Sequence, residues 1–136
     1  MRAALAIALL CAGAHQAVAQ GPPAADSAAR DSVLRCAVIF AQGAGFRLAP
    51  TQRPGRTGLM RTIESPGPRQ VLDGMRLTVP PGDSAGVVRV DVQVTTFMMA
   101  RTGLDNEEVP PRASLVALAD TLRTRCRSRP AAPPAR

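Results

Sequence analysis

"VVRVDVQVTTFMM", residues 87–99, is the stretch that decides the fold of this chain. Its even-numbered members from Val88 to Met98 are mostly apolar, whereas the odd-numbered members Arg89, Asp91, Gln93 and Thr95 are polar. Side chains alternate between the two faces of a β-strand, so a period of two places every apolar residue on one face. The pattern therefore predicts a strand with one face buried and the other turned to water.

Shorter extended segments precede this strand, and Pro- and Gly-rich turns separate them. We expect strands at residues 46–49, 59–63 and 71–79, the last interrupted near Asp73-Gly74. Residues 100–111, which follow the quoted stretch, contain three acidic residues and read as a loop. With connections this short, an antiparallel meander of about four strands is the expected sheet.

A helix is expected on either side of the strand region in the sequence. Asp26 is a suitable N-cap for a helix to about residue 42, and a second helix should begin between Pro111 and Ser114. Each helix carries one apolar stripe at helical spacing. The sequence thus predicts an α+β fold, a two-layer sandwich with both helices packed on one sheet face.

The N-terminal residues have the pattern of a secretory signal peptide. Arg2 is the basic start, residues 3–14 are apolar, and Ala17-Val18-Ala19 matches a cleavage site. Cys11 follows Leu10, which is too bulky for the small residue that precedes a lipid-modified cysteine, so we expect Cys11 to be removed with the signal. The prediction is an exported protein, periplasmic or secreted, without a transmembrane segment in the mature chain.

The expected organisation follows from these boundaries. Residues 1–19 form the cleaved signal peptide, residues 20–25 a disordered Pro/Ala segment, residues 26–128 a single domain, and residues 129–136 a disordered basic tail. All 17 basic residues are arginines, and the formal net charge is +7, of which the signal peptide carries only Arg2. The abundance of Ala, Arg, Gly and Pro is what a G/C-rich bacterial genome produces without selection for function.

Two cysteines remain in the predicted mature chain, Cys36 and Cys126, one on the apolar stripe of each helix. In an oxidising compartment such a pair forms a disulfide. A redox enzyme would need closely spaced cysteines, as in C-x-x-C, so the expected role of this pair is structural.

Catalytic chemistry has few candidate residues here. The only histidine, His15, lies in the signal peptide, and lysine and tyrosine are absent from the whole chain. No metal-ligating or cofactor-binding motif is present, and the prediction is a protein that is not an enzyme and holds no cofactor. The alternative is a carboxylate-only hydrolase, glycosidase-like, with two of Glu64, Asp73 and Asp91 in a sheet cleft.

The functional hypothesis is a small binding or adaptor module of the bacterial envelope. If Met60, Met75 and Val88 point inward, arginines on neighbouring positions point outward and form an anion-contacting face: Arg47, Arg61, Arg76 and Arg89. Its expected partners are an acidic envelope polymer, lipid headgroups or another envelope protein. With only three aromatic residues in the chain, the composition argues against nucleic acid. Leu59 and Ile63 share the parity of Arg61, which leaves the orientation of that strand open.

Overall fold

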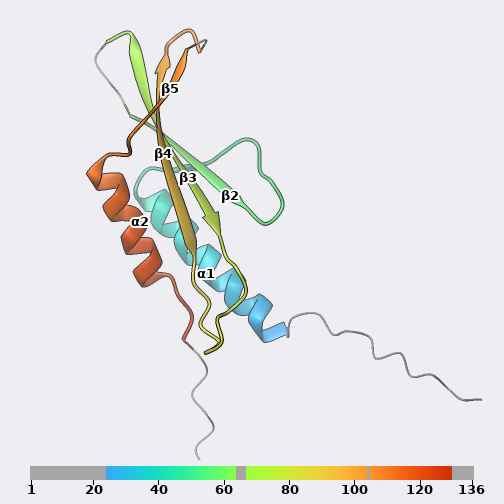
Figure 1. Ribbon diagram of the computed structural model, residues 1–136. Coiled ribbons are helices and arrows are strands. Elements are labelled where there is room, and N and C mark those ends of the chain that lie inside the picture. Colours follow the sequence, from blue (N-terminus) through green and yellow to red (C-terminus); the bar gives the residue numbers. More distant parts are fainter. Residues whose placement is uncertain (1–23, 64–66, 104, 130–136) are drawn as a thin grey trace, which may run out of the picture.

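A five-stranded antiparallel meander forms the centre of the protein, and its strands follow one another in chain order. The computed structural model describes residues 24–63, 67–103 and 105–129. The strands are β1 (Arg47–Leu48), β2 (Thr57–Ile63), β3 (Arg69–Thr78), β4 (Asp91–Ala100) and β5 (Asn106–Val109). They lie between helix α1 (Ala24–Gly43) and helix α2 (Ala113–Arg125) in the sequence (Figure 1).

The predicted α+β sandwich is confirmed, with five strands in place of four. The fifth strand, β5, falls in the segment that the sequence analysis assigned to a loop, and it pairs with β4 from Thr96↔Val109 to Met99↔Asn106. The sequence pattern did not indicate this strand, because glutamate is depleted in β-strands. An edge strand tolerates such residues, and the charges protect the unpaired edge from further pairing.

Strand β3 is continuous through Asp73 and Gly74, so the predicted interruption is wrong. Gly74 fits because a Cβ at this position would lie 2.8 Å from Thr95 Oγ1 on β4. Asp73 fits because cationic partners surround its carboxylate, as described below. Helix α1 also begins earlier than expected, at Ala24, since alanine is the best helix former.

The hydrophobic core lies between the sheet and the two helices. Strand β4 contributes Val92 and strand β3 contributes Met75 and Leu77, all three at most 3 % exposed. Residues directly opposite each other in an antiparallel pair point to the same face, and Leu77 stands opposite both Thr57 and Val92. We call this the helix face of the sheet. The alternation predicted for residues 87–99 holds along β4, but the strand begins at Asp91, four residues later than predicted.

The opposite surface of the sheet, which we call the open face, is covered by neither of the two described helices. The register places on it Arg47, Met60, Leu72, Arg76, Gln93 and Phe97, among others. None of these residues belongs to the buried core. Figure 1 shows α1 crossing behind the strands and α2 running beside β4.

A disulfide joins the two helices at Cys36 and Cys126, which confirms the predicted pair. The two residues are 90 positions apart in the chain, and their Cα atoms are 5.6 Å apart. This cross-link supports an oxidising compartment. Among the described residues, no helix is both long and apolar enough to cross a membrane. The predicted signal peptide, residues 20–23 and residues 130–136 lie outside the described residues.

We expect that alkylation under non-reducing, denaturing conditions labels neither Cys36 nor Cys126. Replacing both with alanine should lower the free energy of unfolding by about 4 kcal/mol, because the disulfide restricts a long loop in the unfolded chain. Urea denaturation of the oxidised protein and the double variant measures the difference. Quantitative labelling of both thiols in the oxidised protein would contradict the cross-link.

Candidate functional site

The loop between β1 and β2 carries the arginines that define the candidate site. Its tip is Arg53-Pro54-Gly55-Arg56, with Pro at the second position and Gly55 at φ +70°, the arrangement of a type II β-turn. The Arg56 amide donates to the Arg53 carbonyl at 3.1 Å, and the two arginines form a β-bridge. A turn of this kind holds its first and last residues side by side, so the two arginine side chains leave the loop together.

The side chain of Gln52 fixes the base of this loop. Its amide nitrogen donates to the carbonyl oxygens of Ala49 at 2.7 Å and Gly58 at 3.0 Å. Its amide oxygen accepts from the Gly58 backbone N–H at 3.0 Å. Three hydrogen bonds made by one side chain link the two ends of the loop and restrict the conformations open to the Arg-Pro-Gly-Arg turn.

A hollow of about 350 Å³ lies where this loop meets the open face. It is lined by Thr51, Arg53, Arg56, Gly58 and Arg76, and we call it the arginine hollow. Gly58 stands opposite Arg76 in the β2–β3 register, and because glycine has no side chain the space beside Arg76 stays open. Arg76 Nη1 donates to Gln93 Oε1 at 3.1 Å, which orients its guanidinium. No carboxylate is among the described residues that line the hollow.

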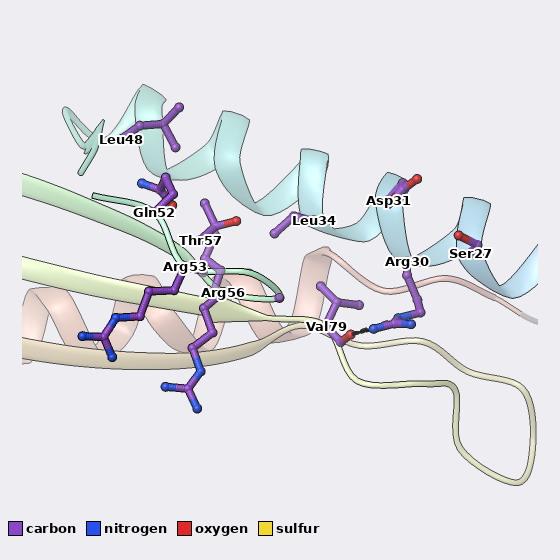
Figure 2. Close-up of a pocket in the computed structure, with 12 residues that line it drawn as sticks. Ser27, Arg30, Asp31, Leu34, Leu48, Gln52, Arg53, Arg56, Thr57 and Val79 are labelled. Atoms are coloured by element: carbon purple, nitrogen blue, oxygen red, sulfur yellow. Dashed lines mark hydrogen bonds between the residues drawn. The ribbon is translucent and has the colours of Figure 1, made fainter. Parts of the chain in front are cut away.

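A second concavity, which we call the cleft, lies on the other side of the loop, between it and α1. It encloses about 530 Å³, with Ser27, Asp31 and Leu34 on the helix wall and Leu48, Gln52 and Thr57 on the loop wall. Figure 2 shows Arg53 and Arg56 extending away from α1, so only their stems line this cleft. Arg30 is occupied there, because its Nε and Nη2 both donate to the Val79 carbonyl oxygen.

Of the four arginines assigned to the predicted anion-contacting face, the register places two on the open face. Arg47 and Arg76 lie on the open face, as expected. Arg89 lies outside the strands, 3.9 Å from the Asp83 carboxylate, and its backbone bridges to Arg127. It therefore does not join Arg76.

Arg61 points to the helix face, so its predicted position on the open face is wrong. It stands opposite Asp73 in the register, and its Nη2 donates to Asp73 Oδ2 at 2.8 Å. The physical reason is parity: burying Leu59, which is 1 % exposed, puts Arg61 on the same face. Met60 then points outward, opposite to the assumption made from the sequence.

Asp73 is the centre of what we call the carboxylate cluster, formed with Arg61, Thr96 and Arg112. Arg112 Nη2 donates to Asp73 Oδ2 at 2.6 Å, and the Thr96 hydroxyl donates to Oδ1 at 3.0 Å. Asp73 is fully buried, and Arg61 also donates to the Ala44 carbonyl at 2.8 Å and lies over the Phe46 ring at 4.6 Å. The cluster thus connects the end of α1, three strands and the start of α2.

The protonation of Asp73 follows from these contacts. Burial raises the pKa of its carboxyl group, but the hydrogen bonds from Arg61, Arg112 and Thr96 and the charge of Arg112 outweigh burial and hold the pKa below its usual range. The general acid of a glycosidase needs a raised pKa, whereas the pKa of Asp73 is lowered. Asp91 stands opposite Thr78 on the open face, so it shares no cleft with Asp73. Glu64 lies outside the described residues.

Arg53 and Arg56 were not among the predicted site residues, because they lie in the Pro- and Gly-rich turn between the strands expected at 46–49 and 59–63, and only strand positions were considered. The available signal was the Pro-Gly pair between two arginines, which predicts a turn that sets both side chains together.

Comparisons of the chain with protein-family models, with curated proteins and with solved structures found no match. The functional argument therefore depends on the geometry of the arginine hollow.

We expect Asp73→Asn to lower the free energy of unfolding by about 3 kcal/mol at pH 7, because Arg61 and Arg112 would lose their counter-charge. A carboxyl with a lowered folded-state pKa contributes stability above its unfolded pKa, about 3.9, and that contribution is lost as the pH falls through the folded pKa. Urea titrations between pH 7 and pH 2 should show this acid loss in the wild-type protein. The same loss should remain in Asp91→Asn and be smaller in Asp73→Asn; an equal loss in both variants would contradict the assignment.

Proposed function

We propose that this protein is a non-catalytic binding module that recognises acidic groups of the bacterial envelope through the arginine hollow. The observation that carries the proposal is that Arg53, Arg56 and Arg76 line one hollow, with no carboxylate among its described lining residues. Export to the envelope is part of the proposal. It is supported by the signal-peptide pattern of residues 1–19 and by the Cys36–Cys126 disulfide.

The chemistry of arginine favours anionic oxygen ligands. A guanidinium binds a carboxylate or phosphate with two parallel hydrogen bonds, and charge-assisted bonds are stronger than neutral ones. Each charge-assisted hydrogen bond contributes about 1.5 kcal/mol or more to the free energy of binding, which corresponds to roughly tenfold in affinity. Two neighbouring acidic groups, as on a uronic-acid polymer or a phosphate-bearing surface, would use all three arginines.

Preorganisation supports a dedicated site over a general positive field. Holding a loop in its bound conformation before the ligand arrives reduces the entropy lost on binding. The Gln52 hydrogen bonds and the Arg53–Arg56 turn do this for two of the three arginines. Arg76 is held by its strand and by Gln93.

The double substitution Arg56→Gln with Arg76→Gln should lower affinity for polygalacturonate and for inorganic polyphosphate by about a hundredfold in 20 mM salt, at roughly tenfold for each contact. Isothermal titration calorimetry of the disulfide-intact protein measures it. Binding of the wild-type protein should fall steeply at 200 mM salt, because exposed charges are screened within about 10 Å at 0.1 M.

The matched control is Arg35→Gln with Arg127→Gln, two exposed arginines away from the hollow. It removes the same charge, so a diffuse field predicts equal losses in both double variants and the proposed site predicts a small loss here. Equal losses, or no binding of the wild-type protein in 20 mM salt, would overturn the proposal. Thermal unfolding should be nearly unchanged in both variants, since surface substitutions shift stability by about 0.5 kcal/mol.

Gln52→Ala tests preorganisation without removing a charge. It deletes the three hydrogen bonds at the base of the loop, and binding should weaken by about tenfold while the sheet stays folded. Calorimetry with polyphosphate measures the affinity, and circular dichroism checks the fold. Unchanged affinity would show that the loop contributes charge alone.

A further inference from the structure

Apolar side chains gather on the open face beside the arginine hollow. Leu72 on β3 stands opposite Phe97 on β4, and both point away from the helices. Met60 on β2 and Met99 on β4 occupy diagonal positions next to Leu72 in the same face. All four are partly exposed. We call them the apolar patch: Met60, Leu72, Phe97 and Met99.

The apolar patch and the arginines share one surface. Arg47 stands opposite Met60, and Arg76 lies on the far side of Gly74 from Leu72 along β3. Figure 2 shows Arg53 and Arg56 directed away from α1, the helix that covers the other side of the sheet. An apolar centre with arginines along one border is the composition of an interfacial membrane-binding surface.

We infer that the open face docks on an anionic phospholipid surface, with the arginine hollow on lipid phosphates and the apolar patch against the headgroup–acyl boundary. This inference rests on the proposed function and names its partner. The apolar patch is the feature that a soluble acidic polymer leaves unexplained, because such a polymer presents no apolar surface to it. Contiguous apolar patches rimmed by polar residues occur at membrane and protein interaction sites.

The charge of the open face favours a lipid surface over a second copy of this chain as its partner. A symmetric dimer through the open face would bring the arginines of one copy toward those of the other. Among the described strand residues, the acidic side chains on this face are Glu108, on the edge strand β5 directly opposite Phe97, and Asp91 opposite Thr78, and neither lines the arginine hollow. Anionic phospholipid instead supplies phosphates to the arginines and hydrocarbon to the apolar patch.

The first experiment is co-sedimentation of the full disulfide-intact chain with vesicles of phosphatidylglycerol and phosphatidylcholine in equal parts, or of phosphatidylcholine alone. Binding should require phosphatidylglycerol and should fall about fivefold for each arginine lost, tested with Arg56→Gln and Arg76→Gln. Leu72→Ser should also weaken it. The matched apolar control is Ile39→Ser on α1, which is 60 % exposed and should leave binding unchanged.

A fluorescent reporter then locates the contact. The chain contains no tryptophan, so Phe97→Trp and Ile39→Trp each introduce a single emitting residue. With phosphatidylglycerol vesicles, the Phe97→Trp emission should shift to the blue and be quenched by lipids brominated on their acyl chains. The Ile39→Trp emission should show neither change. Contact through residues 1–19, which all variants share, would not produce this difference.

The outcomes separate the inference from the proposed function. Polyphosphate binding through the arginine hollow, together with no response of Phe97→Trp to vesicles, would overturn membrane docking and leave the arginine site intact. If polyphosphate binding and the Phe97→Trp response to vesicles are both absent, the proposed function and membrane docking are both overturned. A Phe97→Trp shift that needs no lipid and follows protein concentration, with a dimer in analytical ultracentrifugation, would assign the open face to a second copy and overturn the inference.

Discussion

A buried carboxylate between two guanidinium groups is the interaction on which the arrangement of the layers depends. Asp73 is fully buried, and an isolated charge there would be very unfavourable. Arg61 on β2 and Arg112, the residue before α2, supply the counter-charge. Thr96 on β4 donates a third hydrogen bond. Because these groups come from different elements, the carboxylate is satisfied only when all of them are in their native places.

The same cluster explains two local features that break common preferences. Arginine occupies the N-cap of α2 and makes no side-chain cap there, although Ser, Thr, Asp and Asn are preferred at this position. Its guanidinium is used by Asp73 instead. Arg61 is drawn to the helix face, where it also reaches the Ala44 carbonyl at the end of α1. The helix layer is thus fixed at one end by charge and, farther along α1, by the disulfide.

Because Arg61 points to the helix face, the open face has a different chemistry from the one predicted from the sequence. Met60 turns outward and joins Leu72 and Phe97, and the cations come from the loop before β2 instead. Two arginines separated by a Pro-Gly turn are set side by side by backbone geometry alone. The result is a surface that carries both arginines and apolar side chains, on the side of the sheet that neither α1 nor α2 covers.

Local patterns in the sequence determined both helices and four of the five strands, and the partition of most of their side chains between the two faces. The alternation in residues 87–99, the two helical stripes and the pairing of Cys36 with Cys126 were all predictable, because each follows from the spacing of neighbouring residues. Only the tertiary structure decided the face of Arg61, the pairing of β5 and the meeting of Arg53 and Arg56 with Arg76. These depend on contacts between residues that are distant in the chain, such as Asp73 and Arg112, 39 residues apart. For Arg61, burial of Leu59 sets the face, and the counter-charge of Asp73 makes that face tolerable for a guanidinium.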